Sequence, residues 1–133
     1  MDDHDRVITK AAAGTVAEVT ARFRDLLSAK GVTIFAVIDQ AAAARTAGLT
    51  LRDTVLVIFG NPAAGTPVMQ AAPLSALDLP LKLLIWDDDG MTRLAYYSPE
   101  AISERHGLPM ETTAALAAIH TLTDALAEPH PLS

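Results

Sequence analysis

The stretch from Val55 to Ala72 restricts the backbone of this chain more than any other segment. It begins with V-L-V-I-F, a continuous apolar run rich in β-branched side chains, and Gly60 ends that run. Two helix-start signals follow, Asn61-Pro62 and Thr66-Pro67, each a capping side chain before a proline. The pattern predicts a buried strand that turns sharply into a helix beginning at Thr66.

Strong signals for secondary structure lie on both sides of this stretch. Thr15 and Glu18 have the spacing of a capping box, which predicts an amphipathic helix that ends at Gly31. The segment Val32 to Ile38 is apolar on both faces, which is typical of a central strand that is covered on both sides. Asp89-Gly90 predicts a hairpin turn between two antiparallel strands, Leu81 to Trp86 and Thr92 to Tyr97.

The remaining elements complete the predicted order β-α-β-(α)-β-α-β-β-α-α. A first strand is expected over Arg6 to Ala13, and a short helix ends at Gly48. Ser98-Pro99 starts another short helix that Gly107 stops. The last helix begins at Pro109, and its predicted buried stripe is Ala115, Leu116, Ile119, Leu122 and Leu126. Because a hairpin joins neighbouring strands, the order favours an α+β fold, an antiparallel sheet packed against helices, over doubly wound α/β.

Composition limits what such a domain can do. With 133 residues the chain has the length of one domain, 1–133, with a core from about 6 to 127. A formal net charge of −6 argues against nucleic-acid binding, and the absence of cysteine excludes disulfides and thiolate metal sites. The N-terminal residues are acidic and no apolar run is long enough to span a membrane, so we expect a cytoplasmic protein. A hydrophobic content of 50% is high enough to suggest that part of the surface covers a partner.

Four motifs recur in the order of a known family. They are F-G-N-P-A-A-G-T-P-V-M-Q-A-A at Phe59 to Ala72, D-L-P-L-K at Asp78 to Lys82, W-D-D at Trp86 to Asp88, and E-R-H-G-L at Glu104 to Leu108. The chain resembles the domain of unknown function 302 family from about Thr15 to Leu108. The resemblance implies a compact α+β domain similar to the TATA-binding-protein-like architecture, and a homodimer. It implies no established activity, and the cysteine that many relatives carry beside the Asn-Pro step is Gly60 here.

The stretch from Val55 to Ala72 also supplies four of the five candidate ligand-binding residues. Gly60 and Gly65 are spaced like the glycines of a phosphate-binding loop, but Thr66 and Pro67 replace its Lys and Ser/Thr, which excludes that nucleotide site. The amides at the start of a helix at Thr66 are a candidate site for a carboxylate or another small anion. The candidate set is Gly60, Asn61, Gly65, Thr66 and Lys82. The same sequence is fully explained as a tight turn with two caps, and this structural interpretation is the favoured one.

Other polar residues give weaker candidates for chemistry. His106 is followed at once by a predicted helix end and has Glu104, Tyr96 and Tyr97 nearby in sequence, so a cluster for proton transfer is conceivable. The alternative is a structural role, in which His106 stabilises the end of a helix. Asp87 to Asp89 lack the spacing of a calcium loop, and we expect no metal site there.

Three hypotheses about function therefore stay open. The first is a non-catalytic homodimer that binds a small anionic or apolar ligand near the segment Phe59 to Gln70. The second is an enzyme in which His106 acts as acid or base near Lys82. The third is a purely structural interaction module. None of the three requires a cofactor.

Overall fold

The computed structural model of the protein describes residues 7–127 and has the predicted order of elements, with a 3-10 helix added before the fourth strand and the last helix divided in two. The strands are β1 (Val7–Ala12), β2 (Thr33–Asp39), β3 (Thr54–Gly60), β4 (Leu81–Asp88) and β5 (Met91–Tyr97). The helices are α1 (Val16–Ala29), α2 (Gln40–Thr46), α3 (Pro62–Ala71), the 3-10 helix η2 (Pro73–Leu77), α4 (Pro99–His106), α5 (Met110–Leu116) and α6 (Ala118–Ala127). Expectations about Arg6 and about the two tails, which include His4 and His130, lie outside the described residues.

The five strands form one antiparallel sheet in the order β1-β5-β4-β3-β2. The prediction that Val32 to Ile38 is a central strand is therefore wrong, because β2 lies at the edge. Its apolar side chains divide between two environments. Ile34 and Val37 pack against the core, whereas Phe35 and Ile38 are exposed. A register shift between Ile34 and Ala36 marks a bulge, a common feature of edge strands.

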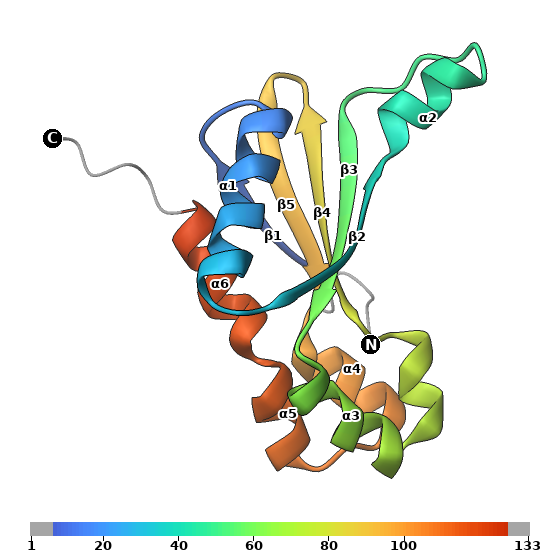
Figure 1. Cartoon of the computed structure of the whole chain (residues 1–133), viewed down its shortest axis with the longest axis vertical. Helices are drawn as coiled ribbons and strands as arrows, with labels where there is room; N and C mark the ends of the chain where they lie inside the picture. Colours follow the sequence, from blue (N-terminus) through green and yellow to red (C-terminus); the bar gives the residue numbers. More distant parts are fainter. Residues whose placement is uncertain (1–6, 128–133) are drawn as a thin grey trace, which may run out of the picture.

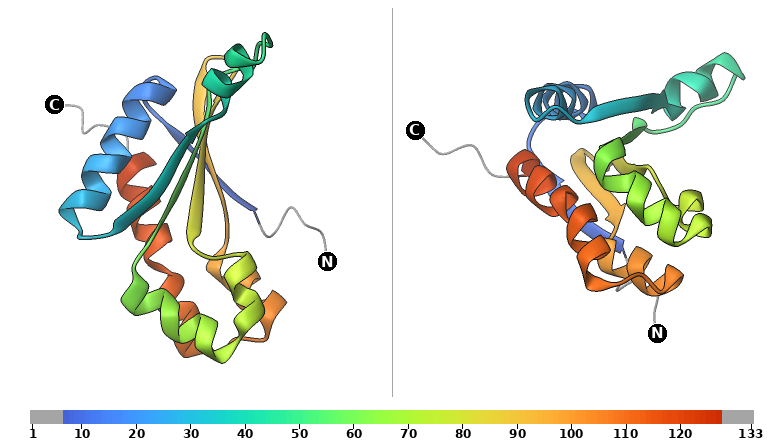
Figure 2. Two further views of the ribbon diagram at one scale, coloured as in Figure 1. Left: turned by 45° about the vertical axis from the view of Figure 1, so that its right-hand side comes forward. Right: turned by 60° about the horizontal axis from the view of Figure 1, so that its bottom comes forward.

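One face of the sheet packs against α1 and α6 (Figure 2). Along β3 and β4 the residues alternate, so that Val55, Val57 and Phe59 are buried whereas Leu56 and Ile58 are not. Phe23 of α1 meets Phe59 edge to face with ring centroids 5.2 Å apart. This cluster is the main hydrophobic core of the domain.

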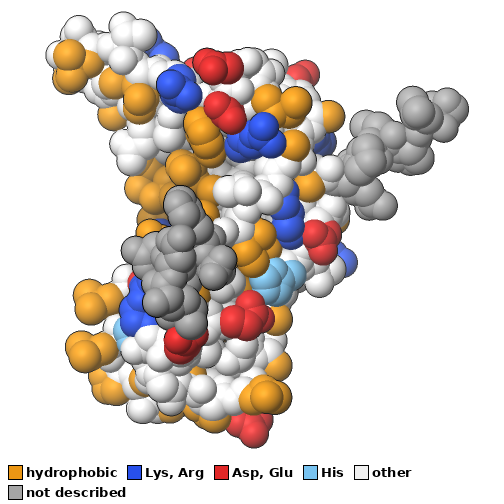
Figure 3. All heavy atoms as spheres, turned by 180° about the vertical axis from the view of Figure 1, so that it is seen from behind, with side chains coloured by type: hydrophobic (Ala, Val, Ile, Leu, Met, Phe, Trp, Pro, Cys, Tyr) orange, Lys and Arg blue, Asp and Glu red, His pale blue; other side chains and the backbone are white. Residues whose placement is uncertain are grey.

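The opposite face of the sheet, here called the open face, is only partly covered. It carries the alternate side chains of each strand, among them Leu56, Lys82, Leu84, Trp86 and Ala95. Seen from behind, hydrophobic side chains gather along this face between the end that carries α2 and the lower helical lobe (Figure 3).

The lower lobe consists of α3, η2, α4 and α5 (Figure 1). It has a small hydrophobic cluster of its own, built on Val68, Leu79, Ile102 and Leu116. Leu81, at the start of β4, packs against both this cluster and the main core. The two cores therefore meet at the end of the sheet where β3 runs into α3.

The helix after β3 begins earlier than expected. Asn61 is the N-cap, its side chain accepts a hydrogen bond from the Ala63 amide, and α3 starts at Pro62. Thr66 and Pro67 lie inside the helix, so the prediction of a helix beginning at Thr66 is wrong. The first of two consecutive start signals was sufficient, because Asn61 already satisfies an amide of the first turn.

Most other helix and turn predictions are confirmed. Thr15 and Glu18 form the capping box of α1, and Gly107 has the left-handed conformation that ends α4. Asp89 and Gly90 both have positive φ, as a two-residue hairpin turn requires. The predicted last helix is divided into α5 and α6, and Ala115, predicted to be buried, is exposed.

Candidate functional site

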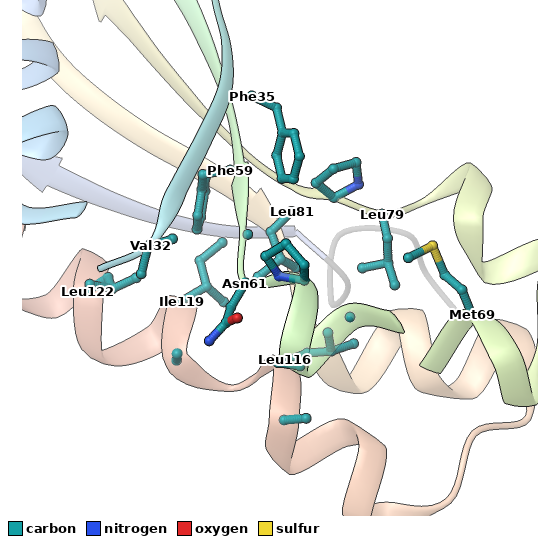
Figure 4. A pocket seen from close by; sticks show the side chains of 17 residues that line it. Val32, Phe35, Phe59, Asn61, Met69, Leu79, Leu81, Leu116, Ile119 and Leu122 are labelled. Atoms are coloured by element: carbon teal, nitrogen blue, oxygen red, sulfur yellow. The ribbon is translucent and has the colours of Figure 1, made fainter. Parts of the chain in front are cut away.

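A pocket lies where the two hydrophobic cores meet, and we call it the seam pocket (Figure 4). Its volume is about 100 Å³. Of the 17 residues that line it, Asn61 alone has a polar side chain. The lining residues come from β2, the β3–α3 turn, α3, the segment before β4, and α5 with α6: Val32, Phe35, Phe59, Gly60, Asn61, Pro62, Ala64, Gly65, Met69, Leu79, Pro80, Leu81, Ala115, Leu116, Ala118, Ile119 and Leu122.

The walls of the pocket follow from the order of the elements. Phe59 and Leu81 are paired neighbours at the same end of β3 and β4, and both point to the helix-covered face. Ile119 and Leu122 of α6 close that side, while Met69 of α3 and Leu79 face it from the lower lobe (Figure 4). The pocket thus exists because the sheet ends where the second core begins.

Asn61 is the polar group at this site. Its side-chain oxygen accepts from the Ala63 amide at 2.9 Å, and its backbone oxygen accepts from Ala64 at 2.9 Å and Gly65 at 2.8 Å. Its side-chain nitrogen makes no hydrogen bond to any residue in the range 7–127. Because Pro62 has no amide hydrogen and the next three amides are bonded, the start of α3 has no free donor for an anion.

Two glycines border the same pocket. A methyl group at Gly60 would lie 3.6 Å from the Cβ atom of Pro80 and 3.8 Å from the ring of Phe35. One at Gly65 would lie 3.9 Å from the terminal carbon of Met69. These are ordinary contact distances, so neither position needs glycine for lack of space. Side chains there would narrow the pocket instead.

The structure divides the predicted ligand-binding set. Gly60, Asn61 and Gly65 line the seam pocket, but Thr66 and Lys82 do not. Lys82 lies on the open face, in a second cavity of about 230 Å³ that we call the open-face groove. The groove is lined by Val7, Leu56, Lys82, Leu84, Ala95, Tyr96 and Tyr97. Alternation along β4 separates Lys82 from the turn that follows β3, and linear spacing could not show this.

His106 is held by a hydrogen bond to Asp78 rather than placed at a pocket. Its Nε2 atom lies 2.7 Å from Oδ2 of Asp78, and its side chain is only 10% exposed. Arg105 donates to both oxygens of Asp78 at 2.8 Å. Burial alone would raise the pKa of Asp78, but the hydrogen bonds from His106 and Arg105 lower it below its usual value. The predicted grouping of His106 with Tyr96 is not formed.

A different histidine pairs with Tyr96. The Tyr96 hydroxyl lies 2.7 Å from Nδ1 of His120, and Nε2 of His120 lies 3.2 Å from Glu100. Lys10 donates to Asp124, Thr123 and the backbone oxygen of His120. Burial would lower the pKa of Lys10, but its hydrogen bonds to Asp124 and Tyr96 raise it above the usual value. In the sequence His120 lies beside the apolar stripe of the last helix. That position did not indicate Tyr96 as its partner.

The acidic hairpin has structural roles. Asp87 accepts a hydrogen bond from the Gly90 amide at 2.9 Å, and Asp88 pairs with Arg93 at 3.2 Å. Among residues 7–127, no three His, Asp or Glu side chains gather as metal ligands. No helix in the same range has the length and apolar character needed to cross a membrane.

Comparisons with known proteins identify the family. The protein-family model described as "Domain of unknown function DUF302" matches residues 8–128 of this chain. The chain is 36% identical over 118 residues to proteins named "Fluoride-specific ion channel FluC 1" from Brucella suis and Brucella abortus. The alignment covers 88% of this chain but 46% and 44% of those proteins, so the chain spans less than half of their length.

A solved structure shows the same fold. It is the crystal structure of an uncharacterized conserved protein DUF302 from Bacillus stearothermophilus, with a TM-score of 0.77 and 18% sequence identity. The likeness covers 92% of this chain and 95% of that one. The predicted α+β fold with one antiparallel sheet is confirmed.

Proposed function

We propose that this chain, which belongs to the DUF302 family, is a non-catalytic cytoplasmic homodimer that binds a small apolar ligand in the seam pocket. The observation that carries the proposal is the lining of that pocket, in which Asn61 is the one polar side chain. Ligand pockets are typically apolar with few polar groups, which fix the orientation of the ligand.

Of the two ligand types expected from the sequence, the apolar one is favoured at this site. An anion entering the seam pocket would lose water without meeting a positive side chain, and the first amides of α3 are already bonded. An apolar molecule meets aromatic and aliphatic walls from both cores. The side-chain nitrogen of Asn61 suits a ligand that also has one hydrogen-bond acceptor.

The enzyme alternative has less support. A general acid or base must reach the reacting group, but His106 is bound to Asp78 and is nearly covered. In the described part of the chain, no ionisable side chain lines the seam pocket. A role of His106 in joining α4 to the segment before β4 accounts for its contacts.

Self-association is supported by exposed apolar side chains at one edge of the sheet. Phe35 and Ile38 of β2 are 52% and 36% exposed, and Leu49, between α2 and β3, is 66% exposed. An edge strand also presents unpaired backbone groups to another chain. We therefore place the proposed dimer contact at β2.

Benzene is a suitable probe of the seam pocket, because it is small and apolar and is known to enter cavities lined by aliphatic and aromatic side chains. In an NMR titration we expect saturable shifts of the Gly60 and Gly65 amide signals. Ala115→Leu adds side-chain volume to the pocket wall and should abolish these shifts. Ala114→Leu on the same helix is the control, because Ala114 is exposed and outside the pocket. Unchanged binding in Ala115→Leu, or no saturable shift in the natural protein, would favour the structural-module alternative.

The dimer is tested by sedimentation equilibrium at micromolar concentration. We expect a dimer for the natural sequence and a monomer for Ile38→Lys, since a charge on an edge strand opposes pairing. Leu77→Lys is the control, because Leu77 is 78% exposed but lies in η2. A natural protein that sediments only as a monomer would refute the homodimer.

A further inference from the structure

The open-face groove has a composition that the seam pocket lacks. Apolar side chains of four strands line it, including Val7, Leu56, Leu84 and Ala95. Among residues 7–127, Lys82 is the one charged residue that lines it. An apolar floor with a single cation is suited to a ligand that has both an apolar part and a negative charge.

Lys82 is held in this groove by the alternation of β4. Leu83 and Ile85 are fully buried in the main core, so Lys82, Leu84 and Trp86 lie on the open face. Within residues 7–127 the ammonium group of Lys82 makes no hydrogen bond or ion pair. Among the described residues, nothing therefore competes with an anionic ligand for this ammonium group.

Two arginines lie against aromatic rings of the open face near the groove. The guanidinium of Arg52 lies 5.8 Å from the ring centre of Trp86, and that of Arg105 lies 5.7 Å from the ring centre of Tyr97. The acidic partners nearby, Asp88 and Asp78, are themselves paired with Arg93 and with Arg105 and His106. Because these carboxylates are engaged by cations, they oppose an anion in the groove less than free carboxylates would.

We propose that the open-face groove binds an amphipathic carboxylate, with its carboxylate on Lys82 and its apolar chain along Leu56, Leu84 and Ala95. The ammonium group compensates the loss of water around the carboxylate, and the apolar floor favours burial of the chain. A second copy of the protein fits this face less well. A two-fold axis through the groove would bring both Lys82 ammonium groups together.

The site is independent of the seam pocket. Phe59 and Leu81, which line the seam pocket, point to the helix-covered face, whereas the groove lies on the open face. Trp86 is the single tryptophan of the chain and lies on the open face, two residues beyond Leu84 on β4. Its fluorescence therefore reports on the groove.

The test is a fluorescence titration with decanoate as the probe, alongside decanol and acetate. We expect a saturable change in Trp86 emission with decanoate at a Kd below about 1 mM, and none with acetate. Lys82→Met keeps the aliphatic stem and removes the charge, so the Kd for decanoate should rise at least about tenfold. Lys82→Arg should retain binding, because it retains the cation.

Controls separate the charge from general hydrophobic binding. Lys30→Met, at the exposed end of α1, should bind decanoate like the natural protein. Ala115→Leu should also leave the Trp86 response unchanged, because it alters only the seam pocket. The proposal is overturned if decanoate gives no response, if Lys82→Met and Lys30→Met behave alike, or if decanol binds as tightly as decanoate. It is equally overturned if Lys82→Met changes the dimer equilibrium, since a second copy would then occupy this face.

Discussion

Replacing Asp78 by asparagine should destabilise the lower lobe, because one carboxylate holds two helical segments together. Asp78 follows η2, and its partners Arg105 and His106 end α4. The three contacts to Asp78 measure 2.7 to 2.8 Å. Asparagine has nearly the same shape but no charge, so the substitution removes the ionic part of all three contacts.

The size of the effect follows from burial. Hydrogen bonds to charged groups contribute roughly 1.5–3 kcal/mol, and bonds that share one carboxylate do not add. The Asp78 side chain is 20% exposed, and His106 would be left nearly covered with a weaker partner. We expect Asp78→Asn to lower the free energy of unfolding by about 2 kcal/mol at neutral pH. For a chain of 133 residues this corresponds to a fall in Tm of about 7 °C.

The effect should depend on pH in a defined direction. The pKa of Asp78 is lower in the folded protein than its usual value, so its contribution is fully present above the unfolded pKa of about 3.9. It is lost as the pH falls through the folded pKa. The difference in stability between the natural protein and Asp78→Asn should therefore shrink in strong acid.

Urea denaturation of both proteins at neutral and acidic pH measures this difference. Asp88→Asn is the matched control, because Asp88 also pairs with an arginine but both side chains are more than one-third exposed. Exposed pairs contribute roughly 0–1 kcal/mol, so the control should be close to the natural protein. Equal midpoints for Asp78→Asn and Asp88→Asn at neutral pH would refute the reasoning.

Three further predictions follow from single contacts. Asn61→Ala removes the acceptor of the Ala63 amide and should cost about 1 kcal/mol; an unchanged urea midpoint would contradict the capping role. Addition of a chelator should leave Tm unchanged, because Asp87 and Asp88 are engaged within the hairpin; a fall in Tm would reveal a structural metal. Lys10→Met should lower stability at neutral pH. Because the folded pKa of Lys10 is raised, the difference should be present below its unfolded pKa of about 10.4 and vanish as the pH rises through the folded value, which alkaline urea titrations can follow.

Local sequence signals predicted the elements well. The capping box at Thr15, the cap at Ser98 and the turn at Asp89-Gly90 each depend on residues close in sequence, and all three are formed. The place of a strand in the sheet is not a local property. The apolar run of β2 could not reveal an edge position, because its alternate residues face the core and solvent.

The candidate site was found only in part for a similar reason. Gly60, Asn61 and Gly65 lie within one turn, so their convergence on the seam pocket could be anticipated. Ile119 and Met69 reach the pocket from separate helices. The partner of His106 is Asp78, 28 residues away, and nothing in the spacing indicated it. Contacts of this kind depend on how the lower lobe folds back on itself.

The division into two hydrophobic cores has a consequence for how the molecule opens. The small cluster of the lower lobe has few buried members, and we expect it to exchange its amide hydrogens through a partial unfolding that leaves the sheet intact. Leu81 belongs to both cores, so β4 should mark the boundary between fast and slow exchange. A molecule bound in the seam pocket would contact both sides of this boundary. Its binding should slow exchange in α3 and α5 while leaving the central strands unchanged.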